Sequence, residues 1–129
     1  IGNNVRTPEK ILGHINSLIQ LSNRFWSTDK PVSMANLRKQ SSKKGWEREV
    51  DLFYHLAVQF DETLSNNITP RKYSPEKILQ GPFMDAFTHV GKLGMLRRMA
   101  GSPIKSESYW MADVKAGQVG PDQPLRVSE

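Results

Sequence analysis

The chain has 129 residues, a usual length for one domain, and its 37% hydrophobic and 24% charged residues are typical of a folded globular protein. It contains no cysteine, which excludes disulfides, thiolate zinc sites and cysteine nucleophiles, so any metal must bind nitrogen and oxygen ligands. No apolar run is long enough to cross a bilayer, and residues 1–10 lack the regions of a signal peptide. We therefore expect a cytoplasmic protein with no membrane partner.

The net charge of +5 raises the question of a nucleic-acid partner. The basic residues form short clusters at 38–39, 43–44 and 97–98, which are separated along the chain. No DNA- or RNA-binding motif accompanies them, and basic residues on a helical protein usually form a solvated face. We expect no nucleic-acid partner and rank that function last.

The first predicted helix begins at Thr7-Pro8-Glu9, because Thr can cap a helix and Pro fits the first helical position. Apolar residues then recur every three or four positions, so the helix is predicted to continue to about Trp26. Residues 27–45 are polar and basic, which predicts a long connection with a short helical turn near 34–38.

A second helix is predicted from about Gly45 to Leu64, where large apolar residues form one stripe. Ser74-Pro75-Glu76 repeats the opening pattern of a helix, but Gly81-Pro82 interrupts it. We therefore expect a short helical turn and then a main third helix from Pro82 to Ala100. Residues 106–116 are predicted to form a shorter last helix, and 117–129 a surface tail.

These patterns predict an all-α fold in a single domain, residues 1–129, with no strand and no internal repeat. Three tryptophans, Trp26, Trp46 and Trp110, could line a ligand pocket, but aromatic residues at helical spacing more often fill a core. Gly91 and Gly94 suggest close approach of a neighbouring helix rather than a phosphate-binding loop, because no strand precedes them.

Three histidines, His14, His55 and His89, stand one on each long predicted helix, a distribution from which a bundle can build a metal site. His14 shares a face with apolar residues three and four positions away, so we expect it to be mostly buried. Asp85 precedes His89 by four residues, which places both side chains on one face, one turn apart. His55 has polar companions around its helix and is expected to face solvent.

Helical geometry therefore favours a metal site made by His14, Asp85 and His89, with His55 contributing instead of His14 as the alternative. The remaining possibility is that the histidines are structural and only satisfy hydrogen bonds. Two nitrogen ligands and one carboxylate leave positions open on zinc, nickel, iron or manganese, an arrangement typical of catalysis. The ligands do not decide between an activated water and direct binding of a substrate thiolate or carbonyl, and other catalytic residues stay unknown.

Two separated segments carry a family resemblance: TPEKILGHI at residues 7–15 and LQGPFMDAFTHVGKLGMLRRMAG at residues 79–101. They resemble the first-histidine helix and the last bundle helix of the DinB-like (damage-inducible) metal-binding four-helix-bundle family of bacteria. That family shows a ligand, three spacers, His and then Gly-Gln-Leu. Here Asp85 stands where His is usual and Lys92 where Gln is usual. The resemblance covers roughly residues 6–122.

The resemblance implies an up-down-down-up bundle with a metal near its open end, and its ligand positions fall on His14, Asp85 and His89. The family has a helix before the one that begins at Pro8, so we expect a missing segment before Ile1, and a homodimer in which a partner covers the exposed face.

DinB-like members include metal-dependent transferases that act with low-molecular-weight thiols, and related hydrolases and isomerases. The resemblance thus implies a metal-dependent enzyme of the thiol S-transferase or hydrolase type, with a small-molecule substrate and with zinc or nickel as the favoured metal. The alternative is a non-catalytic, stress-related module that binds a small ligand or a metal.

Overall fold

The structure is a computed structural model that describes residues 6–27, 32–66, 69–70 and 72–128. Every regular element within these residues is helical and none is a strand, which confirms the predicted all-α fold. The elements are α1 (Pro8–Trp26), α2 (Met34–Gln40), α3 (Gly45–Ser65), α4 (Pro75–Ile78), the π-helical turn η1 (Leu79–Phe83) and α5 (Met84–Met99).

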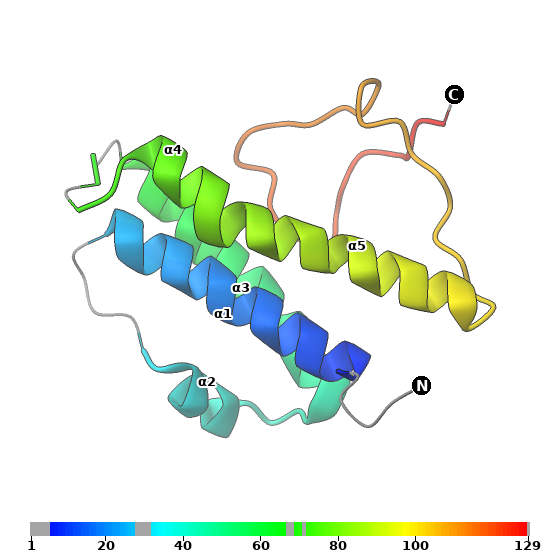
Figure 1. The fold of residues 1–129 in the computed structure, drawn as a ribbon, viewed down its shortest axis with the longest axis horizontal. Helices are drawn as coiled ribbons and strands as arrows, with labels where there is room; N and C mark the ends of the chain where they lie inside the picture. The colour runs from blue at the N-terminus through cyan, green and yellow to red at the C-terminus, as the bar shows by residue number, and fades with distance from the viewer. Residues whose placement is uncertain (1–5, 28–31, 67–68, 71, 129) are drawn as a thin grey trace.

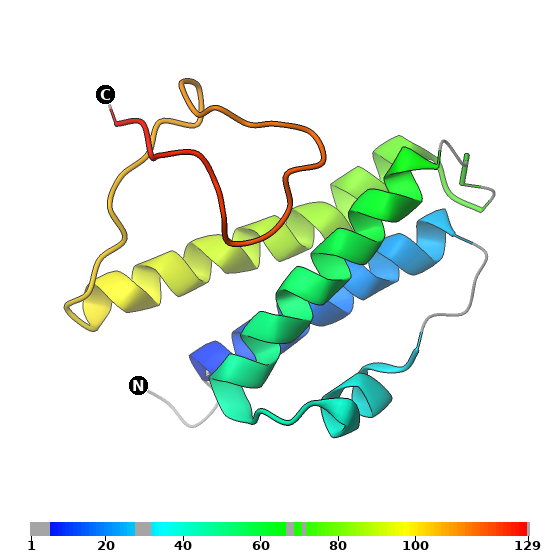
Figure 2. The ribbon, with the colours of Figure 1, turned by 180° about the vertical axis from the view of Figure 1, so that it is seen from behind.

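Helix α1 packs against both other long helices, α3 and α5. In Figure 1, α1 and α3 run in the same general direction and α5 runs back antiparallel to them. The long connection that contains α2 returns along the molecule from the end of α1 to the start of α3, as the view from behind in Figure 2 also shows. The core lies along α1 and is made of Ile11, Leu12, Ile15, Leu18, Ile19, Leu56, Phe60 and Ala86.

The helix starts predicted from local sequence are present. The Thr7 hydroxyl accepts a hydrogen bond from the Lys10 amide (3.3 Å), and Pro8 occupies the first turn of α1. The Ser33 and Ser74 hydroxyls cap α2 and α4 in the same way. These caps satisfy amides that have no partner inside the helix, which is why the starts could be predicted from a few residues.

The predicted start of the third long helix is corrected. Residues from Pro75 to Met99 form one helical rod that is kinked, not a turn followed by a helix at Pro82. The backbone of Gly81 leaves the helical region (φ −85°, ψ −105°), and Pro82 has no amide hydrogen to donate. The wider π-helical turn accommodates this interruption, and α5 begins at Met84.

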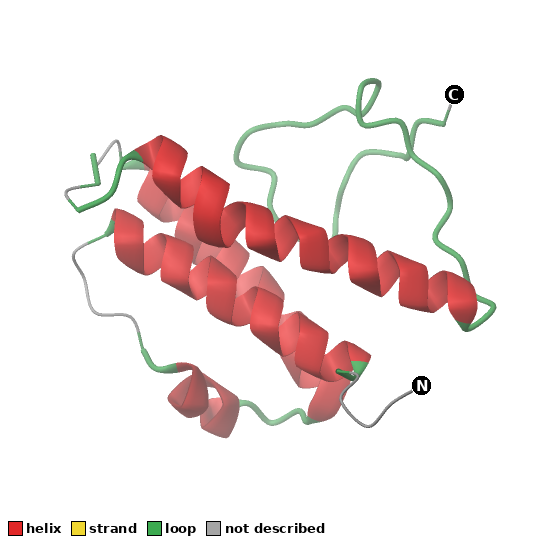
Figure 3. Ribbon diagram, in the orientation of Figure 1, coloured by secondary structure: helices red, strands yellow, loops and turns green. Residues whose placement is uncertain are grey.

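The predicted helix at residues 106–116 is wrong. This segment forms turns within a long irregular tail (Figure 3). Trp110 is 93% exposed, which also contradicts its predicted place in the core. With no buried face, a helix of this length lacks the tertiary packing that stabilises short helices. The tail is instead closed on itself, because the Ser108 amide donates to the Val127 carbonyl (2.9 Å) and Arg126 donates to the Ser106 carbonyl (2.6 Å).

The other tryptophan and glycine predictions have mixed outcomes. Trp26 packs against the core, whereas Trp46 is exposed. Nothing lies within 4 Å of the position that a Cβ on Gly91 would take, so no helix approaches there. At Gly94 the close neighbour is the Ile104 side chain (3.3 Å), which belongs to the tail and not to another helix.

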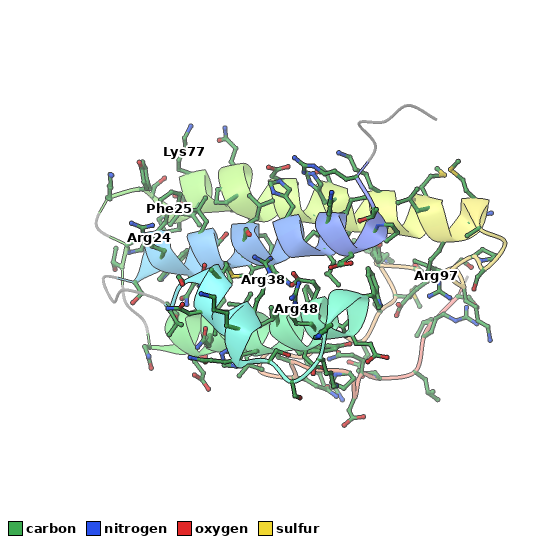
Figure 4. The ribbon with its side chains drawn as sticks, turned by 90° about the horizontal axis from the view of Figure 1, so that it is seen from below. Arg24, Phe25, Arg38, Arg48, Lys77 and Arg97 are labelled. Carbon is green, nitrogen blue, oxygen red and sulfur yellow. The ribbon has the colours of Figure 1, made fainter. Side chains whose placement is uncertain are left out.

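A buried carboxylate ties α1, α2 and α3 together. Glu49 of α3 is only 2% exposed and pairs with Arg38 of α2 at 2.7 Å. Asn16 of α1 donates to the Glu49 carboxylate (3.1 Å) and to its carbonyl (2.9 Å). Figure 4 shows Arg38 and Arg48 in the region between these helices. Gly13 makes room for the pair, because a Cβ there would lie 3.2 Å from the Arg38 guanidinium.

Candidate metal centre

The antiparallel packing of α1 and α5 brings together three residues that the sequence singled out. His14 lies on α1, and Asp85 and His89 lie one turn apart on α5. One potential ligand atom from each of the three residues lies within 4.8 Å of the other two. The Asp85 carboxylate is 4.0 Å from Nε2 of His14 and 3.2 Å from Nδ1 of His89. The two imidazole rings meet edge to face, with centroids 4.7 Å apart.

The His89 ring is buried and held in one orientation. Its Nδ1 lies 2.7 Å from the carbonyl oxygen of Asp85. A carbonyl can only accept, so Nδ1 carries the proton and donates it, which leaves the lone pair on Nε2. Metal-binding histidines are commonly oriented by such a bond from the second ring nitrogen. The same helix turn that aligns Asp85 with His89 therefore also fixes the tautomer of His89.

His14 is half-buried, with a side chain that is 33% exposed, so the expectation that it is mostly buried is met only in part. Burial lowers the pKa of His14 below 6.5, and electrostatic interactions with His89, Arg6 and Lys92 lower it further. The Asp85 carboxylate acts in the opposite direction but does not outweigh them. The imidazole is therefore neutral at neutral pH, which is the form that binds a metal.

The spacing and chemistry of the three residues fit a divalent metal. Ligand atoms about 2.1 Å from zinc in a tetrahedral site lie roughly 3.4 Å from one another. The Asp85 carboxylate lies 4.0 Å from Nε2 of His14, slightly more than that value. Its 3.2 Å contact with His89 is to Nδ1, which donates to the Asp85 carbonyl and is not the ligand atom. The Asp85 side chain is half-exposed, so its carboxylate is not enclosed by other residues. Two imidazoles and one carboxylate suit zinc, nickel, iron or manganese.

His55, the alternative to His14, lies exposed on α3. Among the described residues it belongs to no group of three that could hold a metal ion. The prediction that it faces solvent is confirmed, and the structure does not bring it to Asp85 and His89.

A hollow of about 580 Å³ opens beside the two histidines. Ile11, Met95 and Leu96 supply its apolar walls, and Arg6 and Lys92 line it as well. Neither cation was predicted from the sequence to belong to the site. Lys92 carried a signal, because it stands three residues after His89 and so shares its helix face. Arg6 carried none, because it precedes α1 and reaches the site only through the packing of α1 on α5.

A second hollow, of about 380 Å³, lies between α1, α3 and α5 and is almost wholly apolar. It is lined by aromatic side chains from α3 and the α5 rod, notably Phe53, Phe60, Phe83 and Phe87, and by Val119 of the tail. Asp61 is the charged residue on its wall.

No family model, no curated protein and no solved structure matches the chain. Within the described residues, none of the helices combines the length and the apolar character that a membrane crossing requires. Any functional assignment therefore rests on the chemistry of the residues at the site.

Proposed function

We propose that the protein is a metal-dependent enzyme in which His14, Asp85 and His89 hold a divalent metal, with zinc or nickel favoured. The observation that carries this proposal is the convergence of the three side chains, from two helices, at the wall of an open hollow. A metal bound there would polarise a substrate carbonyl or lower the pKa of a water or thiol. The chemistry best suited to such a site is thiol S-transfer or hydrolysis, with a low-molecular-weight thiol as one possible substrate.

The protein's own groups prepare the site for this role. The Asp85 carbonyl orients the His89 ring, and burial keeps the His14 imidazole neutral. Ile11 and Leu96 contribute apolar wall to the hollow beside these ligands.

We also propose the DinB-like bundle as the fold type. The relative directions of the helices support this proposal. Helices α1 and α3 run in the same direction and α5 runs in the opposite one, as in the last three helices of an up-down-down-up bundle. The three residues that correspond to the family's ligand positions also lie close together. Asp85 differs from the histidine usual in the family, but its carboxylate is a competent oxygen ligand.

Metal content, measured by plasma mass spectrometry, tests the proposed function. Wild-type protein, reconstituted with zinc or nickel and then desalted, is expected to retain one metal per chain. His14→Ala and His89→Ala are expected to lose it, and His55→Ala, the matched control on α3, to keep it. Circular dichroism of each variant establishes that the helices are intact. Wild-type protein that retains no zinc, nickel, manganese or iron would overturn the proposal.

The apolar hollow between α1, α3 and α5 favours a second candidate function, the binding of a small apolar ligand without turnover. Nile red, a neutral dye, is a suitable probe because it has no charge to attract it to the metal centre. Its fluorescence is expected to rise with wild-type protein and to rise less with Phe87→Ser. The control is Tyr109→Ser, which removes an 82% exposed aromatic residue outside the hollow. Equal dye binding by both variants would rule this hollow out.

A further inference from the structure

The cationic side chains beside the candidate metal centre restrict what it can accept. Arg6 and Lys92 line the same hollow as His14 and His89 but come from different elements, the segment before α1 and the middle of α5. Neither forms an ion pair with any residue in the described part of the chain. Two positive charges that have no ion-pair partner among the described residues therefore line one site.

The charge balance of the hollow is positive even before a metal binds. The described residues that line it include no carboxylate, and Asp85, beside the two histidines, sets one negative charge against the two cations. A divalent metal adds further positive charge, so the complete site favours an anion strongly.

The shape of the hollow adds a second requirement. Its volume of about 580 Å³ suits a small molecule, and Ile11, Met95 and Leu96 give it apolar walls. An inorganic ion would leave those walls in contact with water. The matching ligand has a charged oxyanion at one end and a short apolar body.

We propose that Arg6 and Lys92 form an anion subsite that binds the carboxylate or phosphate of a small organic substrate and directs its reactive end toward His14 and His89. The inference rests on the proposed function for the reaction, but the subsite itself needs no metal. Arg6 suits an oxyanion because its guanidinium presents paired donors, and Lys92 adds a point charge from the facing helix.

Titrations followed by amide NMR of isotope-labelled, metal-free protein test the subsite directly. The probes are butanoate and butyl phosphate, which show whether the subsite binds a carboxylate or a phosphate. Butanamide is the neutral control. At least one anion is expected to shift the amide signals around His14 and Lys92 saturably, and butanamide is not. Lys92→Gln and Arg6→Gln are each expected to raise the dissociation constant about fivefold, and the double variant to abolish saturation.

Lys77→Gln is the matched control, because Lys77 lies on the same helical rod and projects away from the helices in Figure 4. Binding that is unchanged in the Arg6→Gln/Lys92→Gln variant, or equally strong with butanamide, would overturn the subsite. Metal content, measured after separate samples of the same proteins are reconstituted with zinc or nickel and desalted, separates this result from the proposed function. Anion binding without metal retention would support the anion subsite and contradict the proposed metal-dependent enzyme. Metal retention without anion binding would contradict the anion subsite alone.

Discussion

Asp85 has the most contacts of the three candidate ligands. Its carbonyl orients His89, and its carboxylate approaches both imidazoles. It also lies in the first turn of α5, where a negative charge is favourable for the helix. A substitution at Asp85 therefore tests the carboxylate alone, because the backbone carbonyl is unaffected.

Asp85→Asn is expected to weaken zinc binding about 10- to 100-fold, because an amide of the same shape is a much poorer ligand. Asp85→His, which replaces the carboxylate with another competent ligand, is expected to retain zinc. Competition with a fluorescent zinc chelator measures both, with Asp113→Asn in the tail as the control. Unchanged affinity in Asp85→Asn would exclude the carboxylate from the site.

His14 should make the stability of the metal-free protein depend on pH. Its pKa in the folded protein lies below the unfolded value of 6.5, so the fold disfavours its protonation. The stabilisation is complete above pH 6.5 and is lost as the pH falls below it toward the folded pKa. The charged and titratable groups that act on this imidazole are His89, Arg6, Asp85 and Lys92.

Thermal unfolding with a chelator present, at about pH 7.5 and about pH 5.5, measures this dependence. The melting temperature of the wild type is expected to fall more between these two values than that of His14→Gln, which cannot be protonated. Equal decreases in the two proteins would show that His14 contributes no pH dependence.

Among the elements, α2 depends most on a single interaction. It has no buried residue of its own and is joined to the bundle through the Arg38–Glu49 pair, with Met34 and Leu37 packed on the core. The pair lies next to Gly13, which precedes His14 on α1. The packing that places α2 therefore also fixes the part of α1 that carries the candidate ligand.

Glu49→Gln is expected to lower the free energy of unfolding by about 2–3 kcal/mol, because it leaves the partly buried Arg38 without its charged partner and Arg48 with Glu9 alone. Denaturation with urea at neutral pH measures the change. Glu47→Gln, an exposed position in the first turn of the same helix, is the control and should change the free energy of unfolding little. A loss no larger than that of the control would show that the pair contributes little.

At the scale of the whole molecule, α5 carries large apolar side chains that stay largely exposed within the described chain, including Phe87 and Met95 at the edges of the two hollows. Large exposed residues recur along it at helical spacing, with Gly91 near the middle: Met84, Phe87, Met95 and Met99. A stripe of this kind is suited to pairing with the same stripe of a second copy, because a two-fold axis makes one surface complementary to itself. The homodimer stays a prediction, and this stripe is the surface we expect it to use.

Light scattering coupled to gel filtration is expected to give the mass of two chains for the wild type. Gly91→Glu places a charge in the stripe without a steric clash and should give the mass of one chain, with helical content retained. Ala35→Glu adds the same charge on the exposed surface of α2 and should stay dimeric. A monomeric wild type at micromolar concentration would contradict the prediction.

Most helix bounds and the Asp85–His89 pair could be predicted from the residues alone. Caps such as Thr7 and Ser74 satisfy amides within three residues, and apolar periodicity defines one face of each helix. The pair on α5 follows from a spacing of four within one helix. Each of these features depends on neighbours in the chain, so its physical cause is contained in a short stretch of sequence.

Three features depend on how the elements pack and not on local sequence. They are the contact between His14 and Asp85, the position of Arg6 at the hollow, and the irregular conformation of the tail. The register of α1 on α5 comes from side chains that interlock across distant parts of the chain, and the same helix faces permit other registers. The 106–116 segment has a helical pattern but no surface that buries it, so packing overrode local propensity there. Local rules specify which residues share a face, whereas the tertiary contacts specify what that face meets.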